Sequence, residues 1–257
     1  MSRRVARGVF FGELAVLPRG RHTLTRGQVK AAQRERLMVA ISELMAEHGY
    51  RNVSVGDIVG RAGVSRSAFY TCFTGKEDCA FAAYDRFIDV LLSAIAQRTA
   101  DASDWDEFIV ALLDGYVSTL VRDLVVARAF QIEMDAVGPE ARERRRQALL
   151  RFAVFIREQQ RRLSAMDASL VQLPDETYLG AVYAVRQVAC DALDQDRTTD
   201  LLALVPRMSA WMAASFRDAG RGSPTASRGS SSGPGRLGLA GSSPPQARSG
   251  GTRRRAQ

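Results

Sequence analysis

The sequence has few of the residues that bind metals or form disulfides. Only three cysteines and two histidines occur among its 257 residues. Cys72, Cys79 and Cys190 are odd in number and lack the spacing of a metal site, and His22 and His48 are too isolated to bind one. We therefore expect three reduced thiols and no metal. A redox role for Cys72, close to the motif described below, is the alternative.

Long hydrophobic runs, strand-like alternation and internal repeats are also absent. No apolar stretch approaches the ~20 residues that a membrane-spanning helix needs. Residues 1–17 have the basic start and apolar run of a signal peptide, but Gly12 and Glu13 interrupt the run and no small-residue cleavage site follows. We expect residues 1–17 to be a disordered extension and the protein to be soluble and cytoplasmic. A hydrophobic content of 46% is ordinary for a globular protein.

Net positive charge lies at the two ends of the chain. Residues 1–30 carry seven basic residues and one acidic residue, whereas residues 31–80 carry six of each. Residues 81–219 carry 16 basic and 21 acidic residues, and residues 220–257 carry seven arginines and no acidic residue. Because an acidic body repels DNA and a basic arm attracts it, this distribution indicates a DNA-binding end and a separate body.

The most informative stretch runs from Ser54 to Phe73 and has the pattern of two short helices joined by a tight turn. Ser54 is placed to cap the first helix, and Asp57 suits the positive end of that helix. Gly63 stands where the first helix must end, because a residue without a Cβ adopts the left-handed conformation most easily. Ser65 then caps the second helix. This pattern predicts a helix-turn-helix.

The second short helix has an apolar face and a polar face. Phe69 and Phe73 lie four residues apart and share the inner face with Val64. An arginine can bind the O6 and N7 of guanine together, a serine can bind either base edge, and a tyrosine hydroxyl can bind a phosphate oxygen. An ordinary helical hairpin with a polar face is the alternative. The outer, candidate DNA-reading face consists of Arg66, Ser67, Tyr70 and Thr71.

Residues 58–77 read I-V-G-R-A-G-V-S-R-S-A-F-Y-T-C-F-T-G-K-E and resemble the DNA-binding signature of the TetR family of bacterial transcriptional regulators. The shared features are the A-G-V-S turn, the aromatic-Tyr pair, the closing Phe and the Lys-Glu start of a fourth helix. Ala68 and Cys72 depart from the family pattern, which usually has Thr and His there, so one hydroxyl and one phosphate donor are missing. The resemblance implies DNA-backbone contacts from Ser54, Tyr70 and Lys76, and base or groove contacts from Ser65, Arg66 and Ser67.

The rest of the chain predicts helices only. Apolar stripes predict helices over residues 28–48, 76–98, 105–120, 124–137, 139–163, 175–194 and 201–216. We expect an all-α fold in which a basic arm and a three-helix helix-turn-helix module (residues 18–75) precede a helical effector-binding and dimerisation domain (residues 76–219). The tail, residues 220–257, should not fold, because 21 of its 38 residues are Gly, Ser or Pro.

The family resemblance also implies a small-molecule pocket in the body and a homodimer. Glu133 or Arg128 could orient an effector, and the sequence does not choose between them. Apolar faces on helices 175–194 and 201–216 predict the dimer seam, and a C₂ dimer would place two reading helices in successive major grooves about 34 to 36 Å apart. Aromatic stripes are also typical of a plain core. The predicted pocket lining is Trp105, Phe108, Tyr116, Phe130, Met134, Phe152, Phe155 and Tyr178.

Together these features predict a ligand-responsive dimeric repressor that a small hydrophobic effector releases from a palindromic DNA operator, without a cofactor. A transcriptional activator of the same fold, or a dimeric adaptor that no longer binds DNA, are the alternatives. A helical enzyme would need a nucleophile with a base or converging carboxylates. The acidic clusters at residues 104–107 and 191–196 have the pattern of solvated helix ends, so we predict that the protein is not an enzyme.

Overall fold

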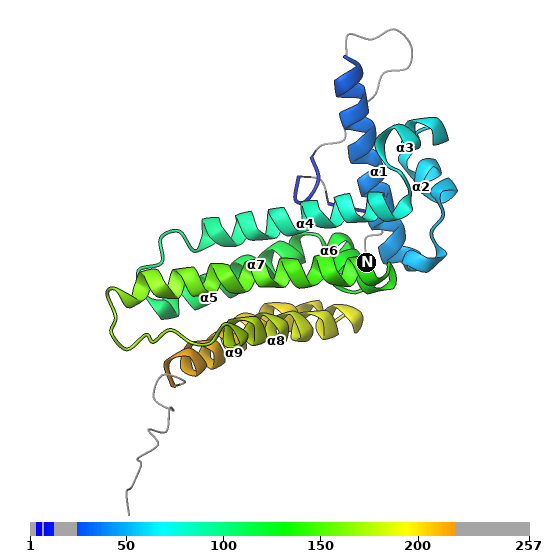
Figure 1. The fold of residues 1–257 in the computed structure, drawn as a ribbon. Helices are drawn as coiled ribbons and strands as arrows, with labels where there is room; N and C mark the ends of the chain where they lie inside the picture. Colours follow the sequence, from blue (N-terminus) through cyan, green and yellow to red (C-terminus); the bar gives the residue numbers. More distant parts are fainter. Residues whose placement is uncertain (1–3, 7, 13–24, 219–257) are drawn as a thin grey trace, which may run out of the picture. The chain divides into compact units, whose positions relative to one another are not determined.

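Helices form every regular element in the part of the chain that the structure describes. A computed structural model describes residues 4–6, 8–12 and 25–218 (Figure 1). The elements in chain order are α1 (Arg26–His48), η1 (Tyr50–Asn52), α2 (Val55–Ala62), α3 (Arg66–Cys72), α4 (Lys76–Arg98), α5 (Trp105–Arg122), α6 (Leu124–Gln131), η2 (Glu133–Ala136), α7 (Pro139–Ser164), α8 (Asp175–Asp194) and α9 (Thr198–Asp218). The prediction of an all-α fold is confirmed.

The first three helices pack as a helix-turn-helix module, and their predicted caps are confirmed. Ser54 and Asp57 form a reciprocal capping box at the start of α2, in which the Asp57 amide donates to Ser54 Oγ at 3.2 Å. Gly63 ends α2 in the left-handed conformation, with φ of 65°. Ser65 Oγ accepts from the Ala68 amide at 3.1 Å and caps α3. The angle between α2 and α3 is therefore fixed by short polar side chains and one glycine.

Helices α4 to α9 form the body. Figure 1 shows α4 and α5 running side by side, with α8 and α9 on the other side of α5 from α4. Helix α5 packs against α4 and α9, and α7 packs against α8. Gly115 permits the close approach of α5 to α4, because a Cβ there would lie 3.1 Å from the Ile95 Cα. Helix α4 therefore packs closely against α5, and its first turn lies next to the helix-turn-helix module.

The segment before α1 packs against the protein, which corrects one expectation. Phe10 and Phe11 are only 1% and 2% exposed, and the Phe10 ring centroid lies 5.2 Å from that of Phe87 on α4. The prediction of a disordered extension over residues 1–17 is therefore wrong for residues 4–6 and 8–12. The rings of Phe10 and Phe11 are buried in the core. The free energy gained by that burial outweighs the conformational entropy lost when the segment is ordered.

Several expectations fall on residues that the structure does not describe. Most of the predicted basic arm, residues 18–24, and the predicted unfolded tail, residues 220–257, lie outside the described residues. The end of the arm, Thr25–Gly27, is described, and there Thr25 caps α1 through a capping box with Gln28. In the described ranges no helix is long and apolar enough to cross a membrane.

Candidate functional site

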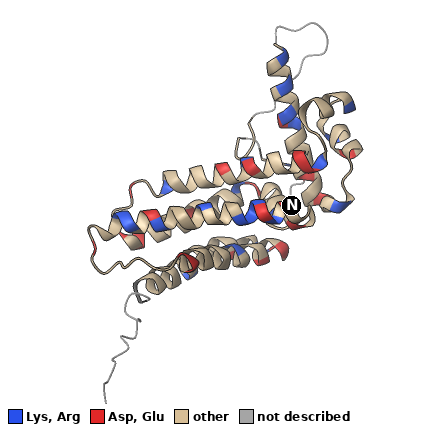
Figure 2. Ribbon diagram, viewed as in Figure 1, with Lys and Arg blue, Asp and Glu red and all other residues tan. Residues whose placement is uncertain are grey.

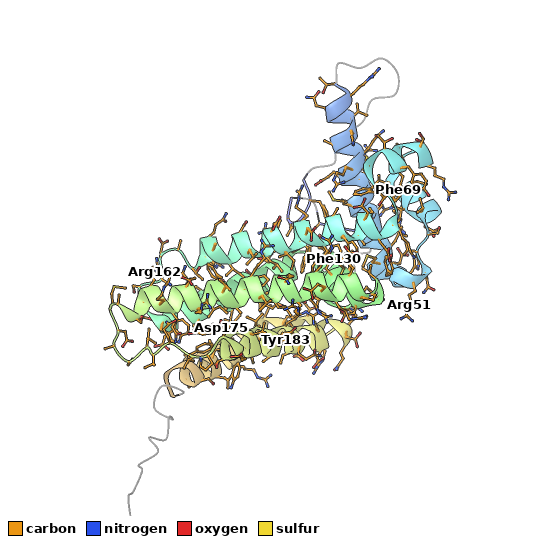
Figure 3. All side chains as sticks on the ribbon, viewed as in Figure 1. Arg51, Phe69, Phe130, Arg162, Asp175 and Tyr183 are labelled. Carbon is orange, nitrogen blue, oxygen red and sulfur yellow. The ribbon has the colours of Figure 1, made fainter. Side chains whose placement is uncertain are left out.

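Helix α3 exposes its polar face and buries its aromatic face. Phe69, which Figure 3 labels in the module, is fully buried. The adjacent Tyr70 is 53% exposed. Arg66, Ser67 and Thr71 are exposed as well. The face that the sequence predicts to read DNA is therefore open to a partner, as binding in a major groove requires. The DNA contact itself stays a prediction.

Three hydroxyl groups among the predicted DNA-binding residues, those of Ser54, Ser65 and Thr71, differ in what they can still donate. Ser54 Oγ lies 2.6 Å from Asp57 Oδ2 and donates its proton there. Thr71 Oγ1 donates to the Ser67 carbonyl oxygen at 3.0 Å. Ser65 Oγ accepts from a backbone amide of α3 and keeps its own proton. Because phosphate oxygens only accept, Ser65 is the one of these three that can bind a phosphate without losing an internal hydrogen bond.

Lys76, which the family resemblance places on the DNA backbone, ties α4 to the module. Its Nζ donates to the carbonyl oxygens of Val53 at 2.8 Å and Tyr50 at 3.3 Å, and it lies 4.3 Å above the Tyr50 ring. Glu133 adds a second tie, because its Oε2 accepts from the Tyr50 amide at 3.1 Å. The loop before α2 is thus held by α4 and η2 together, and at most one Lys76 proton is left for a phosphate.

The first turns of α1 bring positive charge beside α3. Figure 2 shows basic residues along this part of α1, where Arg26 and Lys30 are exposed. Arg34 Nη1 donates to the Cys72 carbonyl oxygen at 3.1 Å, and its guanidinium stacks 4.4 Å from the Phe73 ring centroid. This flank favours a negatively charged partner next to the candidate DNA-reading face.

The thiol of Cys72 lies against the same flank. Burial raises its pKa, and the nearby Lys30 and Arg34 only partly oppose that effect. The thiol is therefore protonated near neutral pH, when it is a poor nucleophile. This environment does not favour the redox alternative for Cys72.

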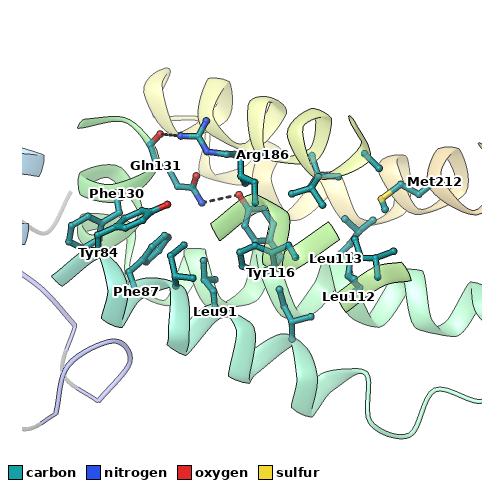
Figure 4. A pocket seen from close by; sticks show the side chains of 18 residues that line it. Tyr84, Phe87, Leu91, Leu112, Leu113, Tyr116, Phe130, Gln131, Arg186 and Met212 are labelled. Carbon is teal, nitrogen blue, oxygen red and sulfur yellow. Dashed lines mark hydrogen bonds between the residues drawn. The ribbon is translucent and has the colours of Figure 1, made fainter. Parts of the chain in front are cut away.

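A cavity of ≈ 60 Å³ lies inside the body (Figure 4). Eighteen side chains from α4, α5, α6, α7, α8 and α9 line it. Helix α4 contributes a stripe that includes Tyr84, Phe87, Leu91 and Ile95. Leucines and Met212 continue the wall on α5 and α9, so most of the lining is hydrocarbon. Such a cavity suits an apolar ligand.

Three of the eight residues predicted to line an effector pocket lie in the lining of this cavity. Tyr116, Phe130 and Phe152 line the cavity, and their contact with an effector stays a prediction. The ring of Phe216 lies 5.3 Å from that of Trp105 and 5.4 Å from that of Tyr178, in a separate aromatic cluster. Periodicity identifies the inward face of a helix but not which inward residues leave a gap. The other five predicted residues lie outside the lining of this cavity: Trp105, Phe108, Met134, Phe155 and Tyr178.

One end of the cavity is polar. Gln131 Nε2 donates to the Tyr116 hydroxyl at 3.0 Å, and Arg186 Nη2 donates to the Gln131 carbonyl oxygen at 2.6 Å (Figure 4). Arg128 and Glu133, the two residues considered for orienting an effector, do not line this cavity. Arg128 instead pairs with Asp196.

Arg186 is the functional candidate that the sequence reading missed. On helix 175–194 it lies on the same face as Val182 and Ala189, at a position where helical spacing predicts an apolar residue. That interruption was the available signal. An arginine inside an apolar stripe either extends its guanidinium to the surface or binds a specific partner.

Comparisons with known proteins agree with this geometry. Residues 37–83 match the family described as bacterial regulatory proteins, tetR family. The HTH-type transcriptional activator FasR of Mycolicibacterium smegmatis is 28% identical over 91 residues, which are 35% of this chain and 42% of FasR. The HTH-type transcriptional regulator EthR of Mycobacterium tuberculosis is 34% identical over 91 residues, 34% of this chain and 41% of EthR. The matches thus span about two fifths of these relatives.

Solved structures resemble a larger part of the chain. The fatty acid degradation regulator FadR from Bacillus halodurans has a TM-score of 0.61 at 21% identity, over 70% of this chain and 94% of that chain. The transcriptional regulator FadR from Bacillus subtilis, solved in complex with stearoyl-CoA, has a TM-score of 0.61 at 18% identity, over 70% and 97% of the two chains. At these identities the likeness establishes the fold.

Proposed function

We propose that this chain, whose residues 37–83 match the tetR family of bacterial regulatory proteins, is a dimeric transcriptional regulator of that family whose affinity for DNA changes when a small apolar effector enters the body. Residues 18–75 would bind DNA, and residues 76–219 would bind the effector and a second copy of the chain. The candidate DNA-reading face of α3 would enter the major groove of a palindromic operator. Release of the operator on effector binding would make the protein a repressor.

The observation that carries this proposal is that α4 takes part in both sites. Lys76 in its first turn holds the loop before α2, and Phe87 and Leu91 in its middle line the cavity. A parallel link runs through α6 and η2, where Gln131 lines the cavity and Glu133 accepts from the Tyr50 amide. A ligand that moves these cavity walls therefore acts directly on the support of the helix-turn-helix.

Coupling of this kind requires that the effector bind one conformer of the protein more tightly than another. The small size of the cavity supplies such a difference. Its ≈ 60 Å³ is well below the ~300 to 1,000 Å³ typical of small-molecule sites. An effector therefore binds a conformer in which the helices around the cavity are further apart. It shifts the equilibrium toward that conformer by its difference in affinity between the two states, and by no more.

Exposed apolar residues on the last two helices support a dimer. Tyr183 and Val188 on α8 are 41% and 39% exposed, and Leu202 and Trp211 on α9 are 55% and 44% exposed. Exposed apolar side chains on two helices that pack together favour association. A dimer with two-fold symmetry would place one α3 helix in each half-site of the operator. The proposed function therefore requires a second copy of the chain on this surface of α8 and α9.

Retention of genomic DNA tests the proposal. Purified protein should select fragments that share an inverted repeat, and its affinity for them should fall steeply as salt rises, since phosphate contacts release counterions. Binding without sequence preference at every salt concentration would contradict a regulator, and no DNA binding at all would favour the adaptor. Transcription in vitro from a retained fragment then decides the direction of control. Activation is the second candidate, because the relative FasR is named an activator.

A further inference from the structure

The polar end of the cavity carries Arg186, an arginine that has no carboxylate partner in the part of the chain that the structure describes. No carboxylate of the described residues lies within 4.0 Å of the Arg186 guanidinium, whose Nη2 bonds only the Gln131 carbonyl oxygen. Nearby arginines of α7 have acidic partners: Arg145 pairs with Asp135, and Arg151 Nη2 lies 3.1 Å from Asp89 Oδ1. A half-buried charge is costly to leave unpaired.

Two phenol groups at the same end have protons to donate. The Tyr116 hydroxyl accepts from Gln131 Nε2 at 3.0 Å, and no acceptor in the described chain takes its own proton. Tyr84, which also lines the cavity, has no hydrogen-bond partner for its hydroxyl among the described residues. Burial raises the pKa of both phenols while the charge of Arg186 opposes this, so both stay protonated at neutral pH. This end of the cavity therefore offers donors and positive charge.

The opposite end has no such groups. Figure 4 shows Leu112, Leu113 and Met212 at the end away from Gln131 and Arg186. Leu91 lies along the wall between the two ends. The lining therefore changes along its length from polar and cationic to aliphatic.

We propose that the effector is an apolar chain ending in a carboxylate, with its head at Arg186 and its tail toward Met212. This inference rests on the proposed function, in which the cavity is the effector site. A carboxylate can accept two hydrogen bonds from a guanidinium and further bonds from the phenols, and it supplies the missing negative charge. An alcohol of the same length fills the same apolar volume but leaves Arg186 unpaired. The cavity therefore selects for the acid.

The head group would also act where the signal to the module begins. Arg186 is bonded to the backbone of Gln131, and two residues further along the chain Glu133 accepts from the Tyr50 amide of the loop before α2. A carboxylate that draws Arg186 away from this carbonyl disturbs the end of α6, two residues before η2 begins. The carboxylate head would thus act on the loop before α2 through η2. The apolar tail, which moves the helices around the cavity apart, would act on the same loop through α4.

Calorimetric titration of the full chain at pH 7.5 with decanoate and with decanol tests the proposal. The parent protein should bind decanoate about 10- to 100-fold more tightly than decanol, the range of a hydrogen bond to a charged group. Arg186→Met should lose that preference and keep its affinity for decanol. Arg142→Met, which removes an exposed arginine of α7, should behave as the parent. Tyr116→Phe keeps the volume of the side chain, and it should weaken decanoate binding alone.

The outcomes separate the two proposals. Equal affinities for decanoate and decanol, or equal losses of both in Arg186→Met, would overturn the carboxylate head and leave an apolar effector cavity in place. Tighter binding of decanoyl-CoA than of decanoate, unchanged in Arg186→Met, would also overturn it, since the head would then be recognised elsewhere. If neither compound binds while the protein still selects its DNA fragments, the carboxylate-headed effector is overturned and the proposed DNA-binding function stands.

Discussion

Arg66 stands at the first position of α3 with its side chain exposed, and no carboxylate of the described chain pairs with it. A guanidinium that is free of internal partners can bind a guanine by two hydrogen bonds. Arg66→Ala should therefore reduce base discrimination by about 1–3 kcal/mol. The measurement is the difference in binding free energy between a retained operator and a duplex with one changed half-site. Arg142→Ala should discriminate as the parent does, and a parental preference in Arg66→Ala would show that another residue reads the base.

Lys76 gives a second prediction, because two roles are open to it. Its Nζ bonds to the Val53 and Tyr50 carbonyl oxygens identify it first as a support of the loop before α2. Lys76→Met should weaken operator binding by loosening α2 while leaving the slope of log affinity against log salt unchanged. A phosphate contact would instead reduce that slope by about 1. A salt titration of parent and variant distinguishes the two roles, and a reduced slope would restore the backbone contact that the family resemblance implies.

The segment before α1 joins the module to the body. Arg4 Nη1 pairs with Glu43 Oε2 at 3.1 Å, and the Val5 amide donates to Glu43 Oε1 at 3.2 Å. The next amide, that of Ala6, donates to Asp123 Oδ2 at 2.8 Å. Glu43 lies on α1 and Asp123 between α5 and α6, so the segment connects buried carboxylates of the two parts. Glu43 is also the partner of Arg61 on α2.

Removal of the Phe10 ring tests whether this segment is part of the folded protein. Phe10 is 1% exposed and packs on Phe87, which lines the cavity. Phe10→Ala should lower the free energy of unfolding by about 3–5 kcal/mol, through lost burial and the cavity left behind. Urea denaturation followed by circular dichroism measures this. Met166→Ala removes a side chain that is 73% exposed and should change it by less than about 0.5 kcal/mol. Equal effects of the two changes would mean that the segment does not pack in solution.

Filling the cavity should imitate an effector. Leu113 on α5 is 1% exposed and lines the cavity, whereas Val110, three residues earlier on the same helix, is 46% exposed. Leu113→Trp should lower operator affinity about 5- to 150-fold, the usual range of coupling between two sites. Val110→Trp adds a bulky ring outside the cavity and should leave affinity unchanged. A Leu113→Trp protein that melts as the parent and binds the operator equally well would contradict coupling through the cavity.

Local features of the elements could be predicted from the sequence, and the position of the cavity could not. Ser54, Gly63 and Ser65 were predicted as caps because their partners lie within three residues along the chain. Which residues line the cavity depends instead on how the inward faces of six helices meet. In the sequence, Trp105 and Phe130 each belong to the apolar stripe of one helix, and neither stripe shows which of the two lines the cavity. The burial of Phe10 escaped prediction for the same reason, since its partner Phe87 is remote in sequence.

At the scale of the whole molecule, the proposed function depends on two copies of the chain. Leu202 and Trp211 are exposed on α9, which adjoins α8. Leu202→Glu should dissociate the dimer by burying charge against an apolar seam, with sedimentation velocity measuring the mass. Operator affinity should then fall much further than affinity for a single half-site, because the second half-site is bound at high effective concentration only when the two reading helices are joined.

Met166→Glu places the same charge on another exposed apolar residue and should stay dimeric. A Leu202→Glu variant that stays dimeric would place the seam elsewhere, and a monomeric parent protein would contradict the proposed dimer.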